Sequence, residues 1–201
     1  MIISTIVVTL GGGHQLWPSS FLLSKKRNAG NEEYDSTEIM WDLINISYYN
    51  DRKPLLLGIA TDDSHNYHVK SINYSNTGRG WVMVNSKEIK TQSLIEAMES
   101  GSFYSSSGIE LKKVKHNNKR FVVEIEPNKG VDYEISFIGY RKGNSQVQVL
   151  KRVKGNSAKY IFNKNDLFVR AKISSDQIKT NPYVIGETTQ AWTQPVIVNK
   201  Y

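Results

Sequence analysis

The 201 residues contain no cysteine, which excludes disulfide bridges and thiolate metal sites. The formal net charge of +7 favours anionic partners such as phosphates or nucleic acid. No apolar run is long enough to span a bilayer, and residues 1–10 lack the basic start and cleavage site of a signal peptide. The sequence therefore predicts no membrane span and leaves cytoplasm and export both open.

Residues 2–10 are predicted to form a strand, because they are rich in Ile, Val and Thr. Three glycines at positions 11–13 end this strand and place His14 in a turn. A glycine-rich turn after a strand can hold phosphate, but no Lys-Ser/Thr signature follows here. His14 is therefore either a surface histidine or an additional metal ligand.

A helix is predicted over residues 37–48. Asp35 precedes Glu38 by three positions, which resembles a capping box. Ile39 and Leu43 then recur at helical spacing, with Met40 and Ile44 beside them. A second helix is predicted over 91–100, with an apolar stripe and Gly101 as its C-terminal stop.

Residues 55–67 organise the chain. A continuous apolar run is typical of a strand buried on both faces of a parallel sheet. It ends in Asp62, Asp63 and His65, and catalytic groups in such sheets gather past the carboxyl ends of the strands.

Asp63 and His65 are two residues apart, so their side chains leave the same side of an extended chain. A carboxylate beside an imidazole suits a divalent metal such as zinc, manganese or iron. His68 is an additional candidate, and Asp62 is expected to support the ligands. The alternatives are a capping turn for the Asp-Ser-His segment and a solvent-exposed His68.

Arg79 lies between two glycines at the end of a polar, turn-rich stretch. A guanidinium at this position is predicted to bind a substrate phosphate through paired hydrogen bonds. An ordinary surface arginine is the alternative.

After residue 116 the pattern changes to short strands with alternating apolar residues and no helix between them. This alternation is typical of an antiparallel β-sandwich. Glycine turns at 142–144 and 154–156 separate strands. Trp192 and residues 196–198 are expected to form the last strand, which Pro195 places at an edge. The apolar residues that are expected on the inner faces are Phe121, Val123, Ile125, Val131, Tyr133, Ile135, Phe137, Val147, Val149, Tyr160, Phe162, Leu167, Val169, Ala171 and Ile173.

Five segments in order carry a family resemblance: residues 41–43 (Trp-Asp-Leu), 58–67, 78–82 (Gly-Arg-Gly-Trp-Val), 101–108 (Gly-Ser-Phe-Tyr-Ser-Ser-Ser-Gly) and, more weakly, 191–195. Together they resemble the C-terminal part of two-domain members of the PHP (polymerase and histidinol phosphatase) family of metal-dependent phosphoesterases. The main match covers roughly residues 36–109.

The resemblance implies a distorted β/α barrel whose metals activate water against a phosphate ester. It assigns Asp63 and His65 to the late metal-binding motif of that family. The His-x-His motif with which the family begins occurs nowhere in this sequence. We therefore expect a partial PHP-type α/β domain over residues 1–116, a β-sandwich domain over 117–201, weak metal binding and little activity from this chain alone.

The alternative function is a non-catalytic module whose sandwich binds carbohydrate or protein. Exposed aromatic residues on one sheet would favour it, and Tyr140, Tyr160, Phe168 and Tyr183 are the candidates, although core packing is the default for most of them. A basic segment at 112–120 lacks the interleaved aromatics of a nucleic-acid platform, so nucleic acid is the least favoured partner.

Overall fold

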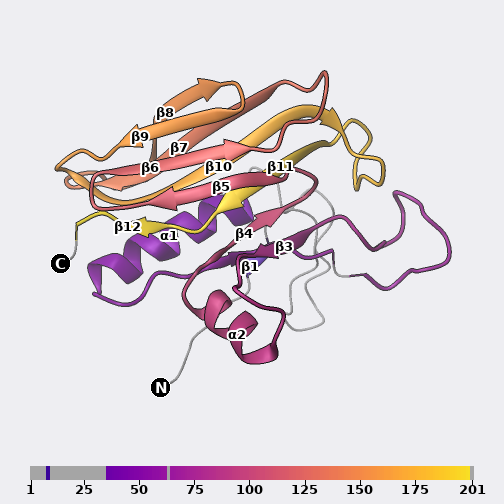
Figure 1. Ribbon diagram of the computed structural model, residues 1–201, viewed down its shortest axis with the longest axis horizontal. Coiled ribbons are helices and arrows are strands. Elements are labelled where there is room, and N and C mark those ends of the chain that lie inside the picture. Colours follow the sequence, from indigo (N-terminus) through magenta and orange to yellow (C-terminus); the bar gives the residue numbers. More distant parts are fainter. Residues whose placement is uncertain (1–7, 10–34, 63, 200–201) are drawn as a thin grey trace.

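The computed structural model describes residues 8–9, 35–62 and 64–199, which are mainly antiparallel β-structure with two short helices (Figure 1). In chain order the elements are β1 (Val8–Thr9), α1 (Thr37–Asn50), β2 (Gly58–Ile59), β3 (Trp81–Val84), α2 (Thr91–Glu99), β4 (Phe103–Ser106), β5 (Leu111–His116), β6 (Arg120–Ile125), β7 (Tyr133–Arg141), β8 (Gln148–Lys154), β9 (Ser157–Ile161), β10 (Asp166–Ile178), β11 (Thr188–Thr193) and β12 (Val196–Ile197).

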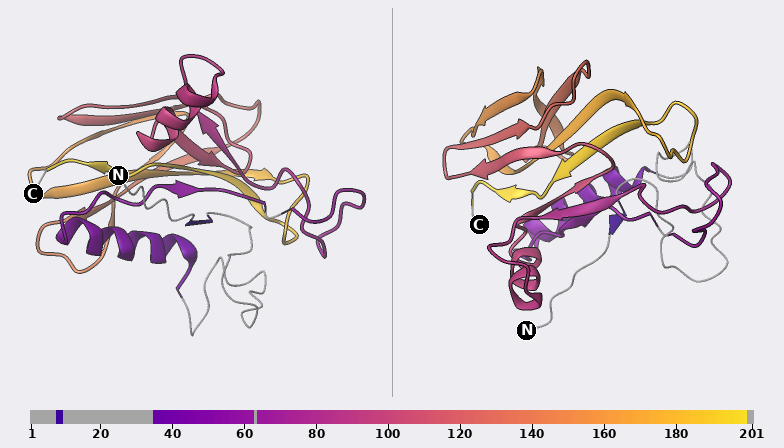
Figure 2. Two further views of the ribbon diagram at one scale, coloured as in Figure 1. Left: turned by 90° about the horizontal axis from the view of Figure 1, so that it is seen from below. Right: turned by 45° about the vertical axis from the view of Figure 1, so that its right-hand side comes forward.

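A seven-stranded antiparallel sheet forms the centre, in the order β3-β4-β11-β10-β7-β8, with β12 paired to β10. A three-stranded antiparallel sheet, β5-β6-β9, packs on one face of it, and α1 packs on the other (Figures 1 and 2). The predicted β-sandwich is consistent with these two packed sheets. Neither helix in the described part of the chain is long and apolar enough to cross a membrane.

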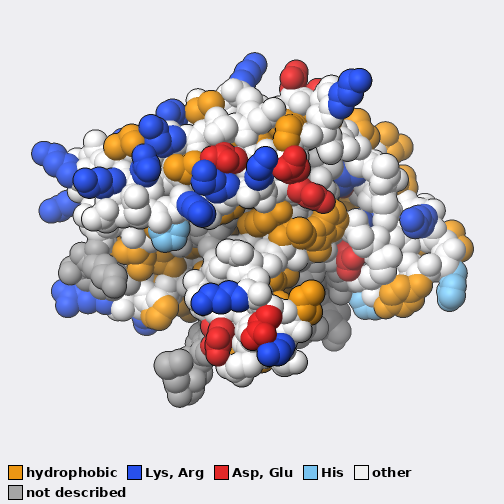
Figure 3. Space-filling view, in the orientation of Figure 1, with side chains coloured by type: hydrophobic (Ala, Val, Ile, Leu, Met, Phe, Trp, Pro, Cys, Tyr) orange, Lys and Arg blue, Asp and Glu red, His pale blue; other side chains and the backbone are white. Residues whose placement is uncertain are grey.

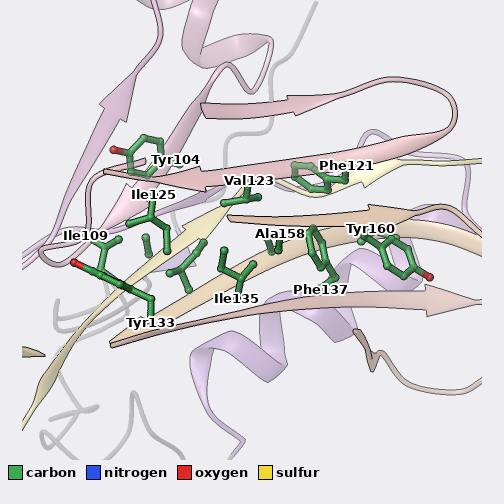
Figure 4. Packing of buried hydrophobic residues seen from close by; sticks show 14 residues of the cluster. Tyr104, Ile109, Phe121, Val123, Ile125, Tyr133, Ile135, Phe137, Ala158 and Tyr160 are labelled. Atoms are coloured by element: carbon green, nitrogen blue, oxygen red, sulfur yellow. The ribbon is translucent and has the colours of Figure 1, made fainter. Parts of the chain in front are cut away.

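The space between the two sheets is filled by apolar side chains (Figure 4). The alternation in the sequence predicted most of them correctly, because successive strand residues point to opposite faces. Phe121 lies edge-on to Phe137 at 5.8 Å between ring centroids, and Phe137 stacks on Tyr160 at 5.5 Å. Three residues are exceptions. A register shift between Asp166 and Phe168 turns Leu167 toward the cluster around α1, Val147 packs in the same cluster, and Val149 is 48% exposed.

The opposite face of the central sheet is also buried. Phe168 of β10 and Tyr140 of β7 pack there against Tyr49 of α1, while Trp192 of β11 packs against Trp41. The sequence pattern does not predict a central sheet with both faces covered, because it indicates two separate domains, over residues 1–116 and 117–201.

Helix α1 forms where its spacing predicts, but its orientation is different from what its apolar residues suggest. Ser36, and not Asp35, caps it by accepting a hydrogen bond from Ile39 N at 3.2 Å. Ile39 is 47% exposed, whereas the polar Asp42 and Asn45 are buried. The helix is therefore docked through the aromatic rings of Trp41 and Tyr49 together with hydrogen bonds and an ion pair, and Ile39 is not part of the docked face.

The partial barrel remains a prediction. Parallel pairing in the described residues is confined to β1 with β2, and these residues show no β/α barrel. The boundary predicted at 116/117 lies in the turn between the paired strands β5 and β6. The central sheet also combines β3 and β4 with strands that follow this boundary.

Candidate functional site

Side chains bind the backbone of strand β2 and of Leu56, which lies two residues before its start. Asn45 accepts from Leu56 N at 2.7 Å and donates to Leu56 O at 3.3 Å. Gln194 makes the same pair of contacts with Gly58, both at 2.8 Å. Ser105 Oγ also donates to Gly58 O at 3.0 Å. Amide and hydroxyl groups thus satisfy the backbone here, as a neighbouring strand would in a longer sheet.

Beyond β2 the chain enters residues 61–80, which we call the site loop. Its described residues form neither helix nor strand. Asp62 is half-buried, and its Oδ2 accepts a hydrogen bond from Gly78 N at 2.6 Å, which brings the two ends of the loop together. The side chains of His65 and His68 are exposed.

Of the two metal ligands predicted from the sequence, Asp63 and His65, the structure describes only His65. Asp63 and His14 lie outside the described residues, so the Asp63–His65 pair stays a prediction. Within residues 8–9, 35–62 and 64–199, no three His, Asp or Glu side chains converge as a metal-binding group. Because a stable site takes three or four protein ligands, His65 and His68 alone do not fit one.

Arg79 lies inside the site loop. It is only 1% exposed. Its Nη1 donates to Tyr74 O at 2.6 Å, its Nη2 to Ser71 O at 2.9 Å, and its Nε to Asn181 Oδ1 at 3.2 Å. Every nitrogen of the guanidinium therefore has a protein acceptor, and the side chain ties the loop together. Its predicted role in phosphate binding stays a prediction.

The connection between β10 and β11, residues 179–187, lies against the site loop (Figure 2). The ring of Tyr183 stacks on the Arg79 guanidinium, 4.1 Å from ring centroid to Cζ. Tyr183 Oη donates to Asp62 O at 2.6 Å, and Asn181 Nδ2 donates to Thr77 O at 2.9 Å. No local pattern predicts these contacts, because their partners lie more than a hundred positions apart in the sequence.

A buried ion-pair cluster joins α1 to the central sheet. Arg170 of β10 is 1% exposed and binds Asp42 through two hydrogen bonds, at 2.7 and 2.6 Å. Glu38 accepts from Arg170 at 2.9 Å and from Lys172 at 2.6 Å. Trp41 lies 5.0 Å from the guanidinium. An arginine within an apolar strand, and two acids four positions apart on a helix, are the signals that would have indicated this cluster.

The charges in this cluster shift one another's pKa values. Burial would raise the pKa of Glu38, but Arg170 and Lys172 outweigh it and the pKa lies below its ordinary value. Burial raises the pKa of Asp42 despite its contact with Arg170. Burial lowers the pKa of Arg170, whereas the two acids raise it by more, so the guanidinium stays charged. Arg170 and Asp42 are buried, with Glu38 and Lys172 at the partly exposed edge, and we assign the cluster to packing.

A second buried carboxylate, Asp166, also has a structural environment. Its Oδ1 accepts from Arg141 Nε at 2.8 Å, and its Oδ2 accepts from Tyr160 Oη at 2.8 Å and from Asn163 N at 2.7 Å. These bonds close the corner at which β9 passes into β10.

The aromatic residues proposed as a binding platform are not available on an exposed sheet face. Tyr140, Tyr160 and Phe168 are buried in the two clusters of the core, and Tyr183 lies against Arg79. A hollow of about 490 Å³ opens between the start of β7, the β8–β9 turn and the end of β10. Of the predicted site residues that the structure describes, namely Asp62, His65, His68 and Arg79, none lines it.

The surface around the site loop is apolar in part. Tyr67 is 67% exposed and Ile185, on the β10–β11 connection, is 82% exposed. In Figure 3 apolar and histidine side chains gather at the right-hand end of the molecule, and lysine and arginine gather at the left-hand end.

Comparisons with protein-family models, with curated proteins and with solved structures gave no match for this chain.

Proposed function

We propose that this chain carries the late metal-binding segment of a PHP-type phosphoesterase, with Asp63 and His65 as the ligands. The observation that supports the proposal most is the exit from β2. This strand pairs in parallel with β1, and the chain leaves its carboxyl end into a loop with Asp62, His65 and His68. Ligands in α/β proteins gather at such strand ends.

The metal in such a site supplies a water of lowered pKa and a positive charge against the phosphate oxygens. In this chain the described residues offer imidazoles without a third converging ligand. Two ligands hold zinc, manganese or iron weakly, so we expect weak cation binding and no rapid hydrolysis of a phosphate ester by this chain alone.

The test is a zinc and manganese titration of the full chain by isothermal titration calorimetry, with p-nitrophenyl phosphate turnover as a second measurement. We expect weak binding that His65→Ala and Asp63→Ala both abolish. His116→Ala, which changes an exposed histidine on β5, is the matched control and is expected to bind as the wild type does. Equal binding by all four proteins would contradict the site, and rapid turnover would show that the ligand set is larger than we propose.

The second candidate is a sandwich that binds an acidic carbohydrate. It is favoured by the distribution of charge: residues 117–201 hold 14 Lys and Arg against 7 Asp and Glu, whereas residues 1–116 hold 12 of each. The whole formal charge of +7 therefore belongs to the second segment, which contains most of the sandwich strands.

A glycan array probed with the full chain tests this second candidate. Binding to acidic glycans that weakens as salt rises would support it, because ion pairs with an exposed surface are screened by salt. Binding to neutral glycans alone, or to none, would remove it.

A further inference from the structure

The turns at one end of the sandwich come from both sheets and are bonded to one another. Phe162 N donates to Lys119 O at 2.9 Å, which joins the β9–β10 connection to the β5–β6 turn. Lys142 N donates to Asn165 O at 2.9 Å, which joins the β7–β8 turn to the same connection. The three turns therefore lie side by side, with their backbones fixed.

The C-terminal end of α1 completes this surface. Tyr49, in the last turn of the helix, donates to Asn199 O at 2.6 Å, and Asn199 Nδ2 donates to Lys164 O at 3.2 Å. In Figure 1 these turns and the end of α1 lie at the left-hand end of the molecule, where Figure 3 shows the gathered lysine and arginine side chains. We call the following residues the cationic end: 51–53, 115–120, 141–144 and 162–166.

The charges of the cationic end are nearly all positive. It holds eight Lys and Arg against two acids, Asp51 and Asp166. Both acids are already paired, Asp51 with Lys53 at 2.9 Å and Asp166 with Arg141 at 2.8 Å. Within the part of the chain that the structure describes, the other six cations have no acidic partner, and all six are exposed: Arg52, Lys115, Lys119, Arg120, Lys142 and Lys164.

The opposite end of the same strands has the reverse balance. Six acids and four lysines occur there, in residues 110–112, 126–134, 154–156 and 174–187. The excess of positive charge on the sandwich is therefore concentrated in the turns of one end. An anionic ligand that is steered by charge would be drawn to this end.

The side chains at the cationic end offer donors rather than acceptors. Asn117 Oδ1 accepts from Lys119 N and Arg120 N, and Asn163 Oδ1 accepts from Asn165 N. Because the oxygens of these two asparagines cap their own turns, their Nδ2 groups are left to donate to a ligand. Ammonium, guanidinium and amide donors together suit a chain of carboxylates or sulfates with hydroxyl groups between them.

The aromatic rings at this end argue against a single-stranded nucleic acid. Phe121 and Tyr160 are buried in the core, and Phe162 is half-buried and packs against it. A platform for nucleic-acid bases needs exposed rings on which the bases stack. An acidic polysaccharide does not need them, because cationic and amide side chains hold its charged and hydroxyl groups.

We propose that the cationic end is the surface through which the sandwich binds an acidic polysaccharide, with Lys119, Lys142 and Lys164, one from each turn, as the central contacts. The inference rests on the second candidate function and assigns that function to a place on the fold. Because the bonds that join the turns are formed before a ligand arrives, the ligand does not have to order them. Exposed ion pairs contribute little singly, so binding depends on several anionic groups of one chain meeting several cations at once.

The test compares two triple variants of the full chain. The first removes one lysine from each turn of the cationic end: Lys119→Ala, Lys142→Ala and Lys164→Ala. The matched control removes three exposed lysines from the opposite end: Lys112→Ala, Lys129→Ala and Lys154→Ala. Both variants have the same net charge, so a difference between them reports the place of binding and not the total charge.

The measurement is isothermal titration calorimetry with an oligogalacturonate, which carries one carboxylate on each sugar, and with a heparin oligosaccharide. A single-stranded oligothymidylate with the same number of residues as the oligogalacturonate is the comparison ligand. We expect the cationic-end variant to bind the acidic sugars about 3- to 100-fold more weakly than the wild type, the range for the loss of three exposed ion pairs. The opposite-end control should bind within about 2-fold of the wild type, because salt screens charges that lie far from the ligand.

The possible failures are distinguishable. No binding of either acidic sugar by the wild type would overturn the second candidate function, and this inference with it. Binding that the two triple variants weaken equally would overturn the placement at the cationic end and leave the carbohydrate-binding function standing. Oligothymidylate that binds as tightly as oligogalacturonate would overturn carbohydrate as the occupant, because the surface would then recognise any linear polyanion.

Discussion

Strand β10 buries its two faces against different chemistry. Toward β5-β6-β9 it presents Val169, Ala171 and Ile173, which belong to the apolar cluster of the sandwich core. Toward α1 it presents Phe168 and Arg170, and the arginine is as buried as the apolar residues. The first face is stabilised by removal of apolar surface from water, which depends little on exact geometry. The second depends on a fixed pairing of charges, because a buried charge without a partner is costly.

The two faces of β10 should therefore lose stability for different reasons when a residue is substituted. On the apolar face the cost of a change should follow the volume that is removed. On the charged face the loss of stability should depend on whether a buried charge is left unpaired. Replacing both members of an ion pair by apolar residues should therefore cost little. The following predictions test this difference.

The largest effect is expected from Phe137→Ala on the apolar face. Phe137 is fully buried between Phe121 and Tyr160, so its truncation leaves a cavity. We expect a loss of about 3–5 kcal/mol in the free energy of unfolding, measured by urea denaturation. Ile161→Ala, at a position that is 58% exposed, is the control and should cost far less.

On the charged face, Asp42→Ala should cost about 3 kcal/mol, at the lower end for a broken buried pair because Glu38 remains beside Arg170. The double variant Asp42→Leu with Arg170→Met should recover most of this loss, since neither charge is then left unpaired. A double-mutant cycle from urea denaturation measures the coupling. A double variant that is less stable than Asp42→Ala would contradict the comparison.

A smaller effect is expected at Glu38, and it should depend on pH. The folded state lowers the pKa of Glu38 below its ordinary value of 4.5. Its carboxylate therefore stabilises the fold above that pH, and the contribution is lost as the pH falls through the lowered pKa. Glu38→Gln should cost about 1–3 kcal/mol near pH 7.

The pH profile isolates this contribution. Asp42 titrates with the opposite sign because its pKa is raised, and it is present in both wild type and Glu38→Gln. The difference in unfolding free energy between the two proteins should therefore shrink as the pH falls from 6 to 3. A difference that is constant over this range would assign the effect of Glu38 to packing rather than to charge.

The smallest effect is expected on the outer face of the three-stranded sheet. Lys113 and Glu124 form a 2.7 Å ion pair there, and their side chains are 39% and 32% exposed. Lys113→Ala should change the unfolding free energy by less than about 1 kcal/mol, because solvent screens the pair. Thermal denaturation measures this change. A loss as large as that of Asp42→Ala would show that burial does not decide how much an ion pair stabilises this fold.

Much of the sandwich could be predicted from the sequence. The period-two pattern marked the inward positions of β6, β7 and β10, because a strand exposes alternate residues to opposite faces. The helical spacing before residue 50 and the glycine stop at 101 located both helices. The edge position of β12, after Pro195, also followed from local chemistry, since this strand is paired only with β10 in the described residues. Trp192, which was expected in the same strand, lies in β11 between β4 and β10.

The candidate site was predicted less completely. The loop follows from its polar composition, and the histidines follow from the resemblance. The burial of Arg79 does not, because the segment Gly-Arg-Gly reads the same whether the arginine side chain is exposed or buried. Tyr183 was a candidate for an exposed aromatic platform, with core packing as the alternative. Its contact with Asp62 joins residues 121 positions apart, so no local pattern indicates it.

The sequence by itself determined which residues alternate, where helices start and where turns fall, because these depend on neighbours within a few positions. Only the tertiary structure decided that the second face of the central sheet is covered by α1, and that Arg170 is neutralised by Asp42 from 128 residues away. It also decided that the sandwich holds the site loop. Pairings between distant polar groups leave no periodic pattern, because each depends on a single contact that exists only once the layers have packed.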